Sequence, residues 1–278
     1  MKRRICVWVA SLAILISLHS TNVLAALYAS TADYALYQIN PGTGSATAIG
    51  FIGGALNPQR MEDIAFSPSG ELYGVSDLRT NQLSSINPNT AATTLIGNLG
   101  AGLSGVAVAL EFSSGGTLYT ATTTGQFGTI NPFTGVAAFV GNIGFNPAGD
   151  LAFAPNGNLY MSAGGIGGNG PSSLVQVNPL TGVGTLVGPI GFSDVFGMDF
   201  IGNTLYGLND SGQLITIDPS TGTGTLVANT SPTVIGLGLA VSPVPEPSSL
   251  LLLLSGLGLG RLTARGRARR RQRDDLRA

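Results

Sequence analysis

Hydrophobic and polar positions recur along this chain in five similar units. Each unit contains a Leu-Tyr pair, then a polar segment, an Asn-Pro or Asp-Pro turn, and a β-branched run that closes on Gly or Ala. The tyrosines of successive pairs are 45, 46, 41 and 46 residues apart. A period of this length is typical of a propeller blade of four strands. The pairs are Leu27-Tyr28, Leu72-Tyr73, Leu118-Tyr119, Leu159-Tyr160 and Leu205-Tyr206.

Four short strands are predicted in each unit. The first is an apolar run such as residues 63–68 or 150–155, followed by a hairpin pair such as Ser69-Gly70 or Asn156-Gly157. These pairs tolerate positive φ and therefore close hairpins. The Leu-Tyr segment is the second strand, an alternating segment such as residues 214–217 is the third, and the β-branched run is the fourth.

The turn before the fourth strand is the most regular feature of the unit. In Asn131-Pro132-Phe133-Thr134-Gly135, Asn can cap the turn, Pro presets φ, and Gly takes the left-handed position. The second unit has Ala91 where the others have Gly. If its backbone is the same, we expect strain of about 1 kcal/mol at Ala91.

The two ends of the repeat region predict how the units assemble. The region starts at Leu27-Tyr28, which is a second strand, and finishes at residues 237–243, which match a first strand. The C-terminal strand would therefore complete the first blade, and closing the ring in this way removes open sheet edges. We predict an all-β fold: a five-bladed β-propeller of four-stranded antiparallel blades, with the tyrosines packed inside the ring. The alternative is an open solenoid.

Residues 1–25 have the composition of an export signal. Lys2, Arg3 and Arg4 precede an apolar stretch over residues 5–18, and small residues lead to Ala25. This order predicts a signal peptide that signal peptidase cleaves after Ala25. A permanent N-terminal anchor helix is the alternative.

Composition limits the chemistry of residues 26–243. This region has no Lys, Cys, His or Trp, and 11 Asp or Glu stand against Arg60 and Arg79, so its net charge is 2 − 11 = −9. A Ser-His-Asp triad, a Cys nucleophile, a Schiff base and an ordinary zinc site are excluded. A lysine-free acidic region is also a poor partner for nucleic acid. Divalent cations remain possible partners.

The C-terminal segment, residues 244–278, has three parts in order. Pro245-Glu246-Pro247 comes first, then an apolar run over residues 248–260, then an arginine-rich end over residues 265–273. As a helix the apolar run would span about 20 Å, less than the ~30 Å of a bilayer core. The run therefore suits transient membrane insertion, through residues 248–264 at most, better than a lasting anchor.

This segment resembles a PEP-CTERM sorting signal. The resemblance implies recognition by an exosortase, cleavage near Pro245, Glu246 and Pro247, and an exported protein at the cell surface or outside a Gram-negative bacterium. It also implies an association with exopolysaccharide and biofilm material. An ordinary membrane tail is the alternative.

Carboxylates are the main acid-base groups left in the repeat region. Asp63 and Asp150 occupy the same register of two first strands, whereas Glu62, Glu111 and Asp199 lie on first strands in other registers. Asp63 and Asp150 are expected to accept hydrogen bonds from backbone amides. Two other roles stay open for them: a site for calcium or another hard cation, and the carboxylate pair of a glycan hydrolase or lyase.

The sequence thus favours an exported, non-catalytic protein that binds or scaffolds an extracellular polysaccharide or biofilm matrix, with no cofactor required. A carboxylate-based glycan hydrolase or lyase is the second hypothesis. A structural filler stiffened by calcium is the third.

Overall fold

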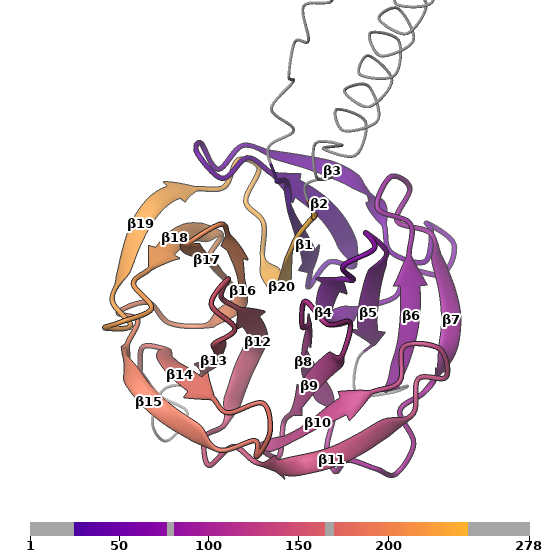
Figure 1. The fold of residues 1–278 in the computed structure, drawn as a ribbon. Helices are drawn as coiled ribbons and strands as arrows, with labels where there is room; N and C mark the ends of the chain where they lie inside the picture. Colours follow the sequence, from indigo (N-terminus) through magenta and orange to yellow (C-terminus); the bar gives the residue numbers. More distant parts are fainter. Residues whose placement is uncertain (1–24, 77–80, 165–169, 244–278) are drawn as a thin grey trace, which may run out of the picture.

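The computed structural model describes residues 25–76, 81–164 and 170–243. Within these ranges the chain forms five four-stranded antiparallel sheets, arranged as blades around a common axis (Figure 1). The predicted five-bladed β-propeller is confirmed. None of these residues forms a helix long and apolar enough to cross a membrane. Residues 1–24 and 244–278, with most of the expected signal peptide and the whole sorting signal, lie outside the described part.

Each blade is named by its place in the ring, and its strands run from the axis outward. Blade 1 contains β20 (Gly236–Val241), β1 (Leu27–Thr31), β2 (Ala35–Ile39) and β3 (Ala46–Phe51). Blade 2 contains β4 (Met61–Phe66), β5 (Leu72–Ser76), β6 (Gln82–Ile86) and β7 (Thr93–Asn98). Blade 3 contains β8 (Ala107–Phe112), β9 (Leu118–Thr122), β10 (Gln126–Ile130) and β11 (Ala137–Asn142). Blade 4 contains β12 (Pro147–Phe153), β13 (Leu159–Ala163), β14 (Ser173–Val177) and β15 (Gly184–Pro189). Blade 5 contains β16 (Val195–Ile201), β17 (Thr204–Asn209), β18 (Gln213–Ile217) and β19 (Gly224–Asn229).

The C-terminal strand closes the ring, as the sequence predicts. Strand β20 pairs antiparallel with β1, with Val241 opposite Leu27. The pairing continues past the strands, because the Ser242 amide donates a 3.0 Å hydrogen bond to the Ala26 carbonyl. The first and last strands of the repeat region therefore share one blade, which removes two open edges.

The tyrosines of the repeat pack between blades. Four of them contact a phenylalanine at the end of the next blade's innermost strand, with ring centroids 5.2 to 6.0 Å apart. The pairs are Tyr28–Phe66, Tyr73–Phe112, Tyr119–Phe153 and Tyr160–Phe200. In the fifth unit, Tyr206 and Val241 pack against the same buried cluster. The tyrosine of each repeat therefore stabilises a blade-to-blade contact.

The Asn-Pro and Asp-Pro turns adopt the expected backbone. The Phe133 amide donates a 2.9 Å hydrogen bond to Oδ1 of Asn131, as a capping side chain should. Ala91 has φ of +59°, close to the +77° of Gly135 in the same position. Ala91 thus occupies the left-handed region, which meets the condition under which the sequence analysis expects strain.

These turns also touch the fourth strand of the preceding blade. A Cβ added to Gly141 would collide with the carbonyl of Thr181, in the next blade's turn. Ala228 takes the place of Gly141 in blade 5, and there the facing residue is Gly44 of blade 1, whose added Cβ would lie 2.8 Å from the Ala228 Cβ. Neither contact leaves room for an added methyl group.

Candidate functional site

The innermost strands carry acidic residues at two levels. In each innermost strand, one residue lies opposite the Leu of a Leu-Tyr pair, as Phe66 lies opposite Leu72. This residue serves as the reference position for aligning the five strands. The lower level lies three residues before this position, and the upper level one residue before it. Side chains two residues apart lie on the same face of a strand. The lower level contains Asp63, Ala109, Asp150, Gly197 and Gly238, and the upper level contains Ala65, Glu111, Ala152, Asp199 and Ala240.

Asp63 at the lower level joins blade 2 to blade 3. Its Oδ1 accepts the amide of Ile64 at 2.7 Å, and its Oδ2 accepts the amide of Leu110 at 2.6 Å. The side chain is fully buried. It therefore satisfies one backbone donor of its own strand and one of the next.

Asp150 makes the same connection from blade 4 and reaches one blade further. Its Oδ1 accepts the amide of Leu151 at 2.8 Å. Its Oδ2 accepts the amides of Met198 at 2.7 Å and Leu239 at 3.0 Å. Together, the two lower carboxyl groups accept one amide from each of the five innermost strands.

The carboxyl groups of Asp63 and Asp150 lie close enough to affect each other's ionisation. Burial raises the pKa of both carboxyl groups well above the ordinary value, and for Asp150 repulsion from Asp63 adds to this effect. Their oxygens point at N–H donors, whose positive ends repel a cation. The geometry therefore favours the hydrogen-bonding interpretation of these residues over calcium binding or catalysis.

Glu111 and Asp199 form the upper level. Oε1 of Glu111 accepts the Phe153 amide of the next blade at 3.4 Å. Asp199 accepts the amide of Phe200 through Oδ1 and that of Val241, in the next blade, through Oδ2, both at 2.6 Å. Both upper carboxylates thus repeat the blade-to-blade connection made below.

The pKa values of the upper carboxyl groups are raised as well. Burial raises the pKa of Asp199 to about 7. Burial is also the largest cause of the raised Glu111 pKa, followed by repulsion from Asp199 and then from Asp150. Near neutral pH, this level therefore holds less negative charge than two ordinary carboxylates would.

The four carboxyl groups link four of the five blade junctions. Asp63, Glu111, Asp150 and Asp199 bridge blades 2–3, 3–4, 4–5 and 5–1 in turn. At the remaining junction, between blades 1 and 2, blade 1 has Gly238 and Ala240 at the two levels, and neither residue has a carboxyl group. A Cβ at Gly238 would collide with Oδ1 of Asp63, so the inner strands approach closely there instead.

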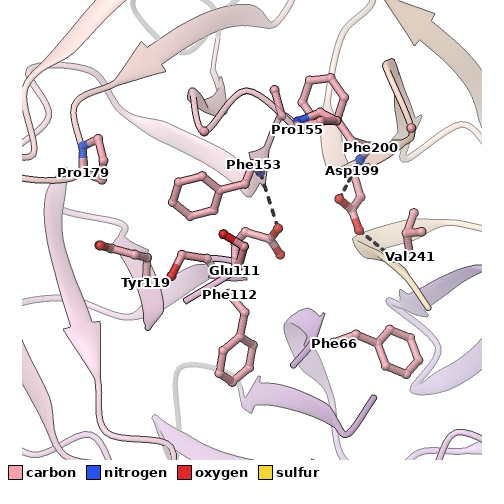
Figure 2. A pocket seen from close by; sticks show the side chains of 15 residues that line it. Phe66, Glu111, Phe112, Tyr119, Phe153, Pro155, Pro179, Asp199, Phe200 and Val241 are labelled. Atoms are coloured by element: carbon pink, nitrogen blue, oxygen red, sulfur yellow. Dashed lines mark hydrogen bonds between the residues drawn. The ribbon is translucent and has the colours of Figure 1, made fainter. Parts of the chain in front are cut away.

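A cavity of about 530 Å³ opens above the upper level, and we call it the mouth. Figure 2 shows Glu111 and Asp199 reaching into its middle, with the phenylalanine rings around them. Its wall combines five aromatic side chains with the loops that follow the innermost strands. The aromatic residues are Phe66, Phe112, Tyr119, Phe153 and Phe200.

The upper carboxylates have acceptor capacity to spare. A carboxylate offers about four lone-pair sites. Asp199 uses two of its sites for backbone amides. None of the described residues that line the mouth is Lys, Arg or His. Of the two arginines in the repeat region, Arg60 contacts Glu62 at 3.1 Å, and Arg79 lies outside the described residues.

The same face of the ring exposes apolar turn residues. Phe133 and Leu180 are 85% and 84% exposed at equivalent positions of two Asn-Pro turns. Phe133 lines a second cavity of about 310 Å³, which shares Phe112 and Ser114 with the mouth. Apolar groups thus extend from the mouth toward the rim.

The expected processing residues are only partly described. Ala25 is included, and its neighbour Ala26 donates a 3.1 Å hydrogen bond to Oγ of Ser242. Pro245, Glu246 and Pro247 lie outside the described residues. Because Val241 lines the mouth, both ends of the repeat region lie on the mouth face.

Comparison with solved structures shows the fold alone. A chain in a nidogen–laminin complex matches with a TM-score of 0.53 and 12% identity, covering 79% of this chain and 98% of that one. A protein from a study of the de novo evolutionary emergence of a symmetrical protein matches with a TM-score of 0.51 and 22% identity, covering 80% of this chain and 100% of that one. A Bacteroides thetaiotaomicron protein of unknown function matches with a TM-score of 0.51 and 16% identity, covering 72% of this chain and 56% of that one. No family model and no curated protein matches the chain.

The sequence placed the acidic residues on the correct strands and singled out Asp63 and Asp150, but it assigned no role to Glu111 and Asp199. Asp63 and Asp150 hold the ring together, whereas Glu111 and Asp199 face the mouth. The sequence does contain a pattern that could have singled out these two residues. Glu111 and Asp199 each directly precede the phenylalanine at the end of the first strand.

Proposed function

We propose that this chain is an exported, non-catalytic protein that binds an extracellular polysaccharide matrix through the mouth. The observation that carries the proposal is the combination of two carboxylates with an aromatic wall in one cavity. Carboxylate oxygens accept hydrogen bonds from sugar hydroxyls, and aromatic rings pack against the apolar faces of sugar rings. A cavity of about 530 Å³ lies in the size range of small-molecule sites.

Export and matrix location are supported by the two terminal segments. Residues 1–25 have the order of a signal peptide, and residues 244–278 resemble a PEP-CTERM sorting signal. We propose that signal peptidase and an exosortase process these segments. A tail that continues from Pro243 would start on the mouth face, beside Ala26.

A glycan hydrolase or lyase is the second candidate, because one observation favours it. Two carboxyl groups with raised pKa values in one cavity fit the general acid and the nucleophile or base of such enzymes. Both oxygens of Asp199, however, already accept backbone amides that connect blades 5 and 1. We therefore assign Asp199 to the framework and to ligand contact, rather than to proton transfer.

A glycan screen combined with a turnover assay tests this proposal. The purified full chain is applied to an array of bacterial exopolysaccharide fragments, and the bound fragments are then incubated with it while new reducing ends and unsaturated ends are measured. We expect binding without new ends, and weaker binding by Glu111→Gln. Asp210→Asn is the matched control, because Asp210 is an exposed carboxylate in a turn on the opposite face.

Two results would overturn the proposal. Turnover that Glu111→Gln or Asp199→Asn abolishes would make the chain an enzyme. Binding that is equal in Glu111→Gln, Asp210→Asn and the unchanged chain would place the ligand outside the mouth.

A further inference from the structure

We propose that the sugar held in the mouth carries a free ammonium group, so that the ligand class is an amino sugar without an N-acetyl group. This inference rests on the proposed function and narrows it. It follows from the charge balance of the mouth, from the acceptors that remain there, and from the apolar wall.

The mouth contains acidic groups from two innermost strands. Glu111 and Asp199 both line the mouth, and no residue with a basic side chain is among the described residues that line it. Arg60, the one arginine of the repeat region that the structure describes, contacts Glu62 instead. Within the described part of the chain, the mouth therefore holds two acidic groups with no basic side chain beside them. A ligand that brings its own positive charge would supply the missing charge.

The remaining acceptors fit an ammonium group. An ammonium group has three N–H donors and no acceptor. Asp199 has about two lone-pair sites left after accepting the amides of Phe200 and Val241. Glu111 adds further acceptors, since its Oε1 accepts the Phe153 amide in a long bond of 3.4 Å. Figure 2 shows both carboxylates in the middle of the mouth, where one ligand can reach them.

An N-acetyl group suits the same place poorly. Acetylation replaces three charged donors with one neutral N–H and adds a carbonyl acceptor. That carbonyl oxygen would approach Glu111 and Asp199, whose ionised forms repel it. The mouth therefore discriminates between the two forms of one sugar by electrostatics, while the wall formed by residues such as Tyr119 and Phe153 is available to the ring of either form.

A bare metal ion fits less well than an organic cation. Calcium takes six to eight oxygen ligands. The described residues contain no group of three or more His, Cys, Asp or Glu side chains that could hold a metal ion. The aromatic wall is also of no use to a small, strongly hydrated ion, whereas it can contact the carbon skeleton of a sugar.

The raised pKa values supply an independent readout. Burial raises the Asp199 pKa to about 7, so this carboxyl group is partly protonated at neutral pH in the free protein. An ammonium group beside it would lower that pKa, because an opposite charge favours the ionised form. At about pH 5.5 the amine of an amino sugar is already protonated, so its binding should release protons from Asp199, and a neutral sugar at the same place should release none.

The test is calorimetric titration of the full chain with two oligosaccharides of equal length and linkage, one of glucosamine and one of N-acetylglucosamine. We expect the glucosamine oligomer to bind about tenfold more tightly at about pH 5.5, where its amines are protonated, as expected for a close ion pair. Titration in two buffers with different ionisation enthalpies should show protons released with glucosamine alone. Glu111→Gln should remove most of the preference, and Asp210→Asn should retain it.

Each other outcome overturns part of the account. Equal or tighter binding of the N-acetyl oligomer, or of other neutral glycans, would overturn this inference and leave the proposed function standing. Failure of every glycan in the screen to bind would overturn both. A preference for glucosamine that Glu111→Gln leaves intact would show general attraction of a polycation to the acidic chain, and spermine should then bind equally well. If Asp199→Asn does not fold, Glu111→Gln still decides the test. Glu111 is connected to another blade only by the 3.4 Å bond from the Phe153 amide to its Oε1, so we expect Glu111→Gln to fold.

Discussion

The amide of Leu239 donates a 3.0 Å hydrogen bond to Oδ2 of Asp150. This bond ties the closing strand β20 to a side chain of blade 4, in addition to its pairing with β1. The ring is thus closed in two ways. Backbone pairing joins the ends of the repeat region, and buried carboxyl groups connect the innermost strands around the axis.

The buried carboxyl groups differ in the number of backbone amides from which they accept hydrogen bonds. Asp150→Ala leaves the amides of Leu151, Met198 and Leu239 without their acceptor. A buried unsatisfied donor costs about 1–3 kcal/mol. We expect the free energy of unfolding at pH 5 to fall by at least about 3 kcal/mol. Urea titration followed by tyrosine fluorescence measures it.

Asp63→Ala is the matched comparison, because it removes the acceptor of two amides rather than three. It should therefore lower stability less than Asp150→Ala does. A loss below about 1 kcal/mol in both variants would contradict the assignment of these side chains to ring closure.

Stability should depend on pH through Asp199. Its pKa is about 7 in the folded chain, whereas an unfolded Asp titrates near 3.9. The folded state therefore binds a proton that the unfolded state has released between these values. Its contribution to stability is complete below about pH 4 and is lost as the pH rises through about 7.

We expect the free energy of unfolding to be lower at pH 8 than at pH 5, by about 2–3 kcal/mol from this group alone. Asp199→Asn should flatten the profile by that amount, while Asp210→Asn should not. Calorimetric melting at unit pH steps gives the profile. A wild-type curve that rises from pH 5 to pH 8 has the opposite sign to the one predicted.

Removal of the closing strand should abolish cooperative folding. A chain that ends after Ile235 lacks β20, so it exposes the edge of β1 and leaves two junctions of the ring without an inner strand. We expect this chain to aggregate or to melt without a sharp transition. A chain that ends after Pro243 keeps β20 and should melt like the full chain. Cooperative melting of both truncated chains at one temperature would disprove closure by β20.

The contact between Gly44 and Ala228 should show strong coupling. Gly44 has φ of +70°, and an added Cβ would lie 2.8 Å from the Ala228 Cβ. Gly44→Ala should therefore lower stability by more than the ~1–2 kcal/mol of left-handed strain alone. Ala228→Gly combined with Gly44→Ala should recover part of the loss, because one methyl group then occupies the contact. Chemical unfolding of the two single variants and the double variant measures the coupling, and additive effects would rule out the steric clash.

The sequence predicted the ring because the information lies in local patterns. Turn residues such as Asn131 and Gly135 are determined by φ and by capping, and the match of residues 237–243 to a first strand predicted the closure.

The roles of the carboxyl groups were harder to predict. Side-chain acceptors that span blades, such as Asp63 with Leu110, depend on the spacing of strands that are far apart in the sequence. Asp150 lies below the mouth, whereas Asp199 lines it, because the two residues differ by two positions along their strands. Only the folded ring shows which of these two positions is next to the cavity.

The location of a bound glycan tests the central claim most directly, and a crystal structure of the chain with the tightest oligosaccharide from the screen would show it. The account predicts a sugar residue in the mouth, with a donor group about 3 Å from a carboxylate oxygen of Glu111 or Asp199. An oligosaccharide bound on the outer strands or on the opposite face, with the mouth unoccupied, would contradict the account.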